Sequence, residues 1–214
     1  MNPGEQFDSL TERYENWYRR HRSEYVSELE AVRSLLPPVG YGLEVGVGTG
    51  RFAGPLGIPV GVDPSTNMLR RARRRGVKII RAVGENLPFN NNTFDYLVMV
   101  VTICFVDDPK AVIEESGRVL KSGGRLLIGI VDRESELGHI YLEKQAESPF
   151  YRTARFYSVG EIIKYLQSRE WEAPVCRQTL FPGADGKTIQ ESAPGYGEGS
   201  FVVISAGRKT RFIN

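Results

Sequence analysis

The sequence predicts a doubly wound α/β fold, in which helices cover both faces of a mostly parallel sheet. Between residues 40 and 132, short apolar runs alternate with helical patterns. These runs are apolar at nearly every position, which is typical of strands buried on both faces. After residue 170, two further apolar runs follow, and we interpret them as a C-terminal antiparallel hairpin. The expected sheet is therefore Rossmann-like and has seven strands.

The chain begins with a helical pattern over residues 8–36, where apolar side chains recur at steps of three and four. The pattern fits one helix, or two helices separated near Arg22 and Ser23. The pair Pro37-Pro38 ends it, because proline cannot continue a helix. We expect residues 1–38 to form a helical cap on a domain that spans residues 39–214, the whole being one globular unit.

The central part of the chain contains five expected strands, at residues 41–46, 58–62, 77–81, 94–101 and 125–131. A helix is expected from Pro64 to about Arg75. A second should run from Pro109 to Leu120, because proline suits the first helical turn, with a turn at residues 121–124 after it. Right-handed crossovers between the parallel strands would place these helices over the sheet.

The last third of the chain continues with a helical pattern over residues 136–169, interrupted at Ser148 and Pro149. The final two strands are expected at residues 172–181 and 200–207. The stretch between them is rich in glycine and proline, which indicates a loop.

The composition excludes several classes of function. Formal net charge is +2, from 28 basic and 26 acidic residues, so we expect no nucleic-acid partner, and we interpret the arginine-rich run 70–75 as a solvated helix face. We find no membrane-spanning segment and no signal peptide, and therefore expect a cytoplasmic protein. Two widely separated cysteines and two histidines are too few for a cysteine-based zinc site or a multi-histidine centre, and no metal is expected.

A glycine-rich turn follows the first expected strand, with Gly46, Gly48 and Gly50 alternating after Glu44. Ligands of open α/β sheets bind beyond the carboxyl ends of the strands, and glycine lets a ligand approach the main chain closely. A dinucleotide-binding fingerprint would have its third glycine where this chain has Arg51. Glu44 would repel a pyrophosphate, but it suits a ligand that carries an ammonium or sulfonium group.

A second carboxylate, Asp63, ends the second expected strand, 19 positions after Glu44. A carboxylate at that place can accept hydrogen bonds from both ribose hydroxyls, as nucleotide-binding folds use it. Asp63 therefore predicts a nucleoside without choosing between cofactors.

Four segments in order, EVGVGTGRFA, GVDPSTNML, GENLPFNNNTFDY and the run that continues to residue 132, resemble the class I S-adenosylmethionine (SAM)-dependent methyltransferases. The resemblance is greatest to the branch that includes the ubiquinone and menaquinone biosynthesis methyltransferases. It implies SAM as the cofactor, S-adenosylhomocysteine (SAH) as its product and a small molecule as the methyl acceptor.

The resemblance also implies roles for single residues. Glu44 would organise the turn and face the methionine amino group, Gly46 and Gly48 would line the methionine and ribose portions, and Asp63 would bind the ribose hydroxyls. The other residues implied for the cofactor are Pro64, Met68, Gly84, Glu85 and Thr102, of which Met68 is equally interpretable as core.

The chain departs from the family at the adenine end. Where the family usually has an aspartate near the adenine amino group, this chain has Val83, followed by Gly84 and Glu85. Either Glu85 takes over that contact, or backbone groups alone hold the adenine and Glu85 is a plain surface residue.

Aromatic residues gather in two clusters, within residues 7–18 and 141–157. They are expected either to form a lid over an apolar or aromatic substrate, or to fix the cap to the sheet. The residues suggested for substrate contact are Tyr14, Trp17, Phe105, His139 and Tyr141. No general base is identified; His139 and Tyr14 are the candidates, and a structural or surface role is the simpler interpretation of His139. Covalent chemistry by Cys104 would need an activated thiolate.

Two other functions stay open at this point. One is a nicotinamide-dependent oxidoreductase, against which Arg51 and Glu44 argue. The other is a non-catalytic SAM-binding protein, which the lack of an evident base allows. The methyl acceptor and the oligomeric state are not determined by these residues.

Overall fold

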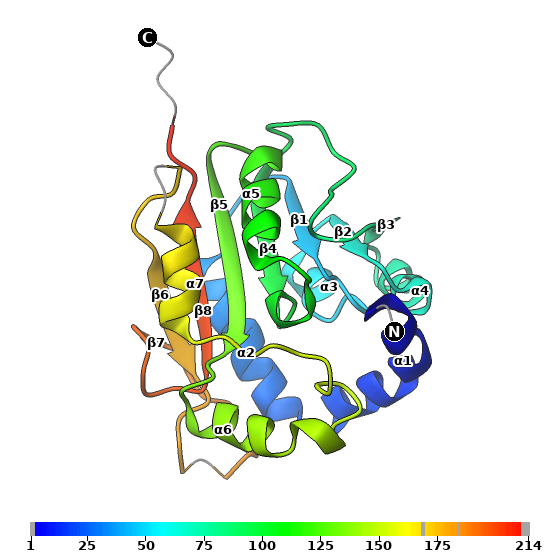
Figure 1. The fold of residues 1–214 in the computed structure, drawn as a ribbon, viewed down its shortest axis with the longest axis vertical. Helices are drawn as coiled ribbons and strands as arrows, with labels where there is room; N and C mark the ends of the chain where they lie inside the picture. Colours follow the sequence, from blue (N-terminus) through cyan, green and yellow to red (C-terminus); the bar gives the residue numbers. More distant parts are fainter. Residues whose placement is uncertain (1–2, 168–169, 184, 211–214) are drawn as a thin grey trace.

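The protein, described by a computed structural model, contains one mixed sheet with helices on both faces (Figure 1). The structure describes residues 3–167, 170–183 and 185–210. Within these residues the sheet has eight strands, in the order β3-β2-β1-β4-β5-β8-β6-β7. The doubly wound α/β fold is confirmed, with one strand more than expected.

Five strands that are parallel to one another run from one edge of the sheet to its middle. They are β1 (Gly42–Val45), β2 (Val60–Asp63), β3 (Lys78–Arg81), β4 (Phe94–Val100) and β5 (Leu120–Val131). The chain moves outward from β1 to β3 and then returns to β4 on the other side of β1. The strand order thus reverses between β1 and β4. Open α/β sheets bind their ligands at the carboxyl ends of the strands at such a point.

The expected C-terminal hairpin is present, as β6 (Val175–Thr179) and β8 (Phe201–Gly207) pair antiparallel, with β8 between β5 and β6. The additional strand β7 (Ala193–Pro194) lies in the stretch that was expected to be a loop, and it pairs with the outer edge of β6. Its two residues are too few to give a strand pattern.

The turn expected at residues 121–124 is instead part of β5, so that prediction was wrong. The register between β4 and β5 shifts between Phe94 and Tyr96, and Gly123 has φ of 76°. These residues therefore form an irregular, bulged start of the strand, for which glycine is suited because it has no Cβ.

Seven α-helices occur in the described residues: α1 (Pro3–Arg20), α2 (Arg22–Leu35), α3 (Ala53–Leu56), α4 (Thr66–Arg74), α5 (Pro109–Val119), α6 (Glu136–Glu143) and α7 (Val159–Leu166). Single 3₁₀ turns lie at Ile103–Phe105 and Gln145–Glu147. The N-terminal pattern is two helices with the break at His21. The helical pattern over 136–169 is interrupted from residue 148 to residue 158, and its residues 168–169 lie outside the described ones.

Alternate residues of the buried strands contact helices on opposite faces. Leu97 and Met99 of β4 pack in one core with side chains of α5 and α7. Val98 and Val100 pack in the other with side chains of α2, α3 and α4. Polar side chains begin the helices: Ser65 accepts a hydrogen bond from the amide of Met68 at the start of α4.

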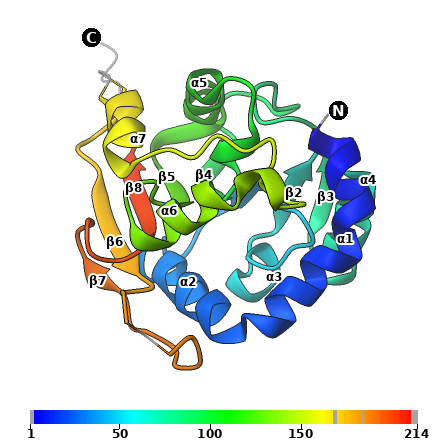
Figure 2. The same cartoon turned by 60° about the horizontal axis from the view of Figure 1, so that its bottom comes forward.

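The carboxyl edge of the sheet is covered by elements from distant parts of the chain. Figure 2 shows α1 along one side of this edge, and α6 with the segment after it across the edge. α1 packs against α4, whereas α2 packs against β6 and β8. In the described part of the chain, no helix combines the length and apolarity needed to cross a membrane.

Candidate active site

A cavity of about 490 Å³ lies at the carboxyl ends of β1, β2 and β4. Most of the residues predicted to hold the cofactor line it, and these are Gly46, Gly48, Asp63, Pro64, Met68, Gly84, Glu85 and Thr102. Of the residues suggested for substrate contact, Tyr14, Trp17, Phe105 and Tyr141 also line the cavity. Glu44 and His139 do not.

The glycine turn is held close to the ends of β2 and β4. Gly46 has φ of 71° and Gly48 has φ of 52°, which L side chains rarely adopt. A Cβ atom on Gly46 would lie 2.3 Å from the side chain of Thr102, whose hydroxyl donates to the carbonyl of Val100 at 3.1 Å. Glycine is therefore required at position 46 both by the backbone conformation and by the packing of Thr102.

Asp63 is buried, yet it lines the cavity, and both of its carboxylate oxygens accept backbone hydrogen bonds. The amide of Gly48 donates to Oδ2 at 2.9 Å and the amide of Ser65 donates to Oδ1 at 2.8 Å. Burial raises the pKa of Asp63 to about 6, although these two amides act to lower it. Each oxygen has further acceptor capacity, so Asp63 fixes the turn and can also accept from a ligand.

Glu44 lies behind the glycine turn, in β1, and only 2% of it is exposed. Its Oε2 atom has no hydrogen-bond partner among the described residues, and burial raises its pKa well above the usual range. Glu44 therefore adds an acidic group behind the turn without lining the cavity, and this suits a ligand with positive charge better than a pyrophosphate. Asp63 in the cavity wall and the glycine backbone beside it fit the nucleoside and the charged tail of SAM.

The part of the cavity that is predicted to hold adenine is lined by residues that follow β3. Val83, Gly84 and Glu85 all line the cavity. Glu85 is already engaged, because its Oε1 accepts from the amide of Asp107 at 2.9 Å. Asp107 lines the same end and was not singled out from the sequence. A role for Glu85 in holding adenine stays a prediction.

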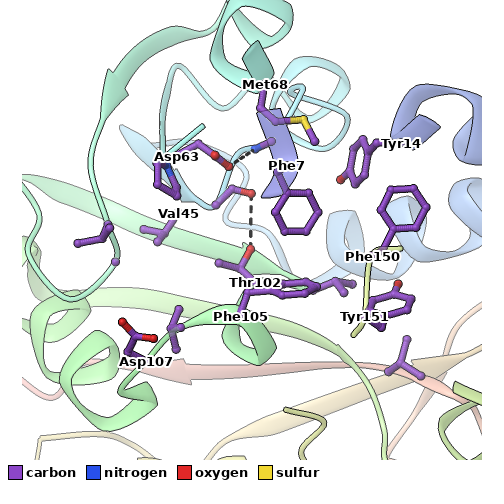
Figure 3. Close-up of a pocket in the computed structure, with 18 of the residues that line it drawn as sticks. Phe7, Tyr14, Val45, Asp63, Met68, Thr102, Phe105, Asp107, Phe150 and Tyr151 are labelled. Carbon is purple, nitrogen blue, oxygen red and sulfur yellow. Dashed lines mark hydrogen bonds between the residues drawn. The ribbon is translucent and has the colours of Figure 1, made fainter. Parts of the chain in front are cut away.

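Aromatic side chains form the other end of the cavity (Figure 3). Phe7 of α1 meets the ring of Phe105 at 5.0 Å between centroids, and Phe105 stacks on Tyr151 at 6.1 Å. Phe150 lies 6.2 Å from Tyr14. The rings thus connect α1 to the segment after α6. Other members of the two predicted clusters, Phe156 and Tyr157, are buried away from the cavity lining.

The three residues weighed for direct chemistry differ in their surroundings. His139 is on the exposed side of α6. Tyr14 shares a 3.1 Å hydrogen bond with Tyr18, and burial raises its pKa, so its hydroxyl keeps its proton near neutral pH. Burial also raises the pKa of Cys104 to about 12, which leaves it without the thiolate that covalent chemistry requires.

Glu28 is a second lining residue, after Asp107, that the sequence patterns did not single out. Glu28 of α2 lines the cavity although only 5% of it is exposed. A signal was present, because Glu28 shares a helix face with the apolar residues Tyr25 and Val32, three and four positions away. A charged residue in an apolar stripe of a helix needs a partner or a function.

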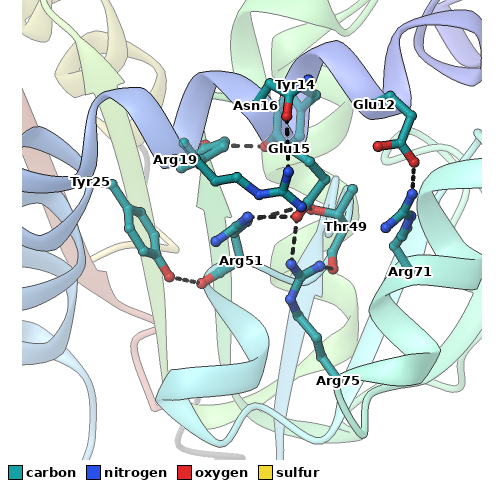
Figure 4. Close-up of polar contacts among 11 residues, drawn as sticks. Glu12, Tyr14, Glu15, Asn16, Arg19, Tyr25, Thr49, Arg51, Arg71 and Arg75 are labelled. Atoms are coloured by element: carbon teal, nitrogen blue, oxygen red, sulfur yellow. Dashed lines mark hydrogen bonds and ion pairs between the residues drawn. The ribbon is translucent and has the colours of Figure 1, made fainter.

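An ion-pair cluster connects α1 to the glycine turn (Figure 4). Glu15 of α1 accepts hydrogen bonds from Thr49 at 2.6 Å, from Arg51 at 2.6 Å and from Arg75 at 2.8 Å. Burial raises the pKa of Glu15, but the bonds from Arg75, Arg51 and Thr49 together lower it to about 2. Arg51, at the place of the third glycine, is therefore a contact for the cap.

The arginine-rich run of α4 is not only a solvated face, so that interpretation was partly wrong. Arg71 pairs with Glu12 and Arg75 pairs with Glu15, and both acidic partners belong to α1. Arg73 and Arg74 are exposed. Which arginines face α1 depends on how the two helices cross, so no local pattern indicates it.

Comparisons with known proteins agree with this site. Residues 43–128 match the family model of a methyltransferase domain. A Thermotoga maritima crystal structure of a SAM-dependent methyltransferase, described as a possible histamine N-methyltransferase, superposes with a TM-score of 0.92 at 47% identity, covering 96% of this chain and 99% of that one. An uncharacterized protein of Methanocaldococcus jannaschii is 45% identical over 94% of this chain and 97% of its own length.

A demethylmenaquinone methyltransferase of Corynebacterium kroppenstedtii is more distant, with 37% identity over 39% of this chain and 36% of its own. Together with the fold and the cavity, these similarities show that the chain belongs to the class I SAM-dependent methyltransferases, with SAM as its cofactor.

Proposed function

We propose that this protein transfers the methyl group of SAM to a small-molecule acceptor bound in the aromatic half of the cavity. The observation that carries the proposal is that one cavity has two chemically different ends. Glycine backbone and the Asp63 carboxylate form one end, and rings from α1 and from residues 141–151 form the other. The first suits a nucleoside with a charged tail, and the second suits a small, largely apolar partner.

When bound, SAM supplies an activated methyl group that can move by in-line displacement. The protein then has to hold the two reactants in line and exclude water. Asp63 would accept from the ribose hydroxyls, and the backbone at Gly46 and Gly48 would contact the methionine and ribose portions. Phe7, Tyr14 and other rings over the cavity would keep water from the acceptor.

The described cavity lining contains no lysine or histidine, and burial keeps its tyrosines protonated near neutral pH, which leaves carboxyl groups as its possible general bases. An acceptor whose nucleophile has a free lone pair, or releases its proton to water, therefore fits this site better than a poorly acidic hydroxyl.

Titration calorimetry with SAM, SAH and NADH tests the cofactor half of the proposal. Incubation with methyl-labelled SAM and a panel of phenols, thiols, carboxylic acids and amines tests the acceptor half. The Thermotoga maritima relative is described as a possible histamine N-methyltransferase, so small amines belong in this panel. Label recovered in one acceptor class is the expected result. Label that never leaves SAM would favour a non-catalytic SAM-binding protein, and NADH binding without SAM binding would contradict the proposal.

A further inference from the structure

Glu28 is a buried carboxylate that faces the cavity without a partner. It lies in the middle of α2, 5% exposed, and lines the same cavity as the aromatic rings. Among the described residues no hydrogen bond or ion pair reaches it, and the charged group that influences it is another carboxylate, Glu24. Glu24 is one helical turn away, and its Oε2 is also buried and unpartnered in the described part of the chain.

The groups around Glu28 are aromatic. Tyr18, Tyr141 and Tyr151 lie within electrostatic reach of its carboxylate, and all three line the cavity. Burial raises the pKa of each of these phenols, so none of them adds a charge near neutral pH. Arg51 stands over the ring of Tyr18, but its guanidinium is bound to Glu15.

An ionised carboxyl group in such surroundings lowers the stability of the folded protein. Removing a carboxylate from water without a partner is unfavourable, and burial together with Glu24 raises the pKa of Glu28 to about 8. An apolar side chain would pack at this position of α2 at lower cost. A carboxylate among ring faces is, however, the combination that binds an ammonium ion, by a charge-assisted hydrogen bond and by cation–π attraction.

We propose that Glu28 binds a basic nitrogen of the methyl acceptor, which makes the acceptor a small organic amine. The inference rests on the proposed function, since it assigns the aromatic half of the cavity to the acceptor. Glu28 acts here as a specificity residue: its carboxylate orients the amine, and the rings of Tyr18, Tyr141 and Tyr151 enclose the remainder. Where the bound nitrogen is also the nucleophile, its ammonium form first gives a proton to the Glu28 carboxylate, which frees the lone pair that takes the methyl group.

Matched amine and alcohol probes test this proposal on the full chain. Binding of 2-phenylethylamine, histamine and tryptamine, and of the alcohols 2-phenylethanol and tryptophol, is measured by calorimetry on SAH-loaded and on ligand-free protein. The variant is Glu28→Gln, which keeps the size of the side chain. The control is Glu30→Gln, two positions along α2, where the exposed glutamate pairs with Arg33.

We expect at least one amine to bind the unaltered protein more tightly than its alcohol. Glu28→Gln should weaken that amine about tenfold or more, because a charge-assisted hydrogen bond is lost, and should leave the alcohols within about twofold. Glu30→Gln should leave both unchanged. SAH affinity and the near-ultraviolet circular dichroism spectrum of Glu28→Gln should match those of the unaltered protein.

Three results would overturn the role of Glu28. The amines could bind no better than the alcohols; Glu28→Gln could bind amines as well as the unaltered protein does; or it could lose SAH and amine equally, which would put Glu28 in the cofactor site. In the first two cases methyl transfer to another acceptor class would still stand. Failure of SAH to bind would reject the proposed function instead, and the ligand-free arm would still test Glu28.

Discussion

Asp63 has two tasks at the scale of one residue. Its carboxylate fixes the glycine turn through the amides of Gly48 and Ser65, and its remaining lone pairs face the cavity. If Asp63 binds the ribose as proposed, the turn and the cofactor depend on the same side chain. A change at this position should affect both, which separates it from a residue that only touches ligand.

We expect Asp63→Ala to weaken SAH binding by about 2 kcal/mol or more, because charge-assisted hydrogen bonds to the ribose are lost. Calorimetry measures this directly, and thermal unfolding of the ligand-free protein should report a parallel loss of stability. Asp95→Ala is a suitable control, since Asp95 also accepts a backbone hydrogen bond, from Tyr41 at 2.8 Å, but lies outside the cavity lining. Unchanged SAH affinity in Asp63→Ala would refute its ribose role.

The buried carboxyls should also make the ligand-free protein less stable as pH rises. The pKa of Glu28 is about 8 in the folded protein, against an ordinary value of 4.5. Between these values the folded state keeps a proton that the unfolded state has released, so the contribution of Glu28 is full below about pH 4.5 and falls toward pH 8. The pKa of Asp63 is raised from 3.8 to about 6, so Asp63 also lowers the stability as pH rises, over the narrower range between these two values.

Urea unfolding at several pH values from 5 to 8 measures this effect. A group that is protonated in the folded state and ionised in the unfolded state lowers the free energy of unfolding by about 1.4 kcal/mol for each unit that the pH rises. Glu28→Gln cannot titrate, so its stability should fall less steeply with pH than that of the unaltered protein. Equal slopes for the two proteins would show that Glu28 is ionised in the folded state over this range.

At the scale of elements, α1 is the part of the cap that forms the cavity wall. It contributes Phe7, Tyr14 and Trp17 to the lining, and Glu15 on another face holds it to Arg51 and Arg75. The position of these α1 rings is therefore coupled to the glycine turn through one buried carboxylate, Glu15.

We expect Glu15→Gln to lower the free energy of unfolding by about 2 kcal/mol or more, because two arginines lose a charged partner. Hydrogen exchange of α1 should become faster, and SAH should bind more weakly. The control is Glu12→Gln, which removes the exposed pair with Arg71 from the same helix and should cost no more than about 1 kcal/mol. Equal effects of the two changes would contradict a special role for Glu15.

The lid itself is tested by Tyr14→Phe and Trp17→Ala. If their rings cover the bound ligands, Trp17→Ala should weaken acceptor binding, because a large aromatic contact is lost. Tyr14→Phe should have the smaller effect, since it removes only the hydrogen bond to Tyr18. Both affinities are read by calorimetry, and unchanged SAM and acceptor affinity in both variants would contradict the lid.

Features that depend on neighbouring residues could be predicted from the sequence, whereas features that depend on distant parts of the chain could not. Ser65 and Pro109 marked helix starts because capping and proline geometry are local properties. The bulge at the start of β5 and the pairing of β7 depend on partners far along the chain, so no local pattern indicates them. For Glu28 a local signal exists, a charged residue in an apolar helix stripe, but the cavity that it lines is formed by segments far along the chain.

At the scale of the whole molecule, three parts of the chain meet around one cavity. The sheet edge contributes the glycine turn and Asp63, α1 and α2 contribute rings and Glu28, and α6 with the segment after it completes the aromatic end. The division into a cap at residues 1–38 and a domain at residues 39–214 stays a prediction. The aromatic end of the cavity is made by residues on both sides of that division, outside the family motifs at the glycine turn and Asp63. If the acceptor binds there as proposed, this accounts for why the motifs specify the cofactor and leave the acceptor open.

A crystal structure of the protein with SAH bound tests the central claim most directly. We expect the ribose hydroxyls to donate to the Asp63 carboxylate, the homocysteine portion to lie along Gly46 and Gly48, and the sulfur to face the aromatic rings on the side of Glu28. A nucleoside bound away from Asp63, or a sulfur directed away from the aromatic end, would contradict the account.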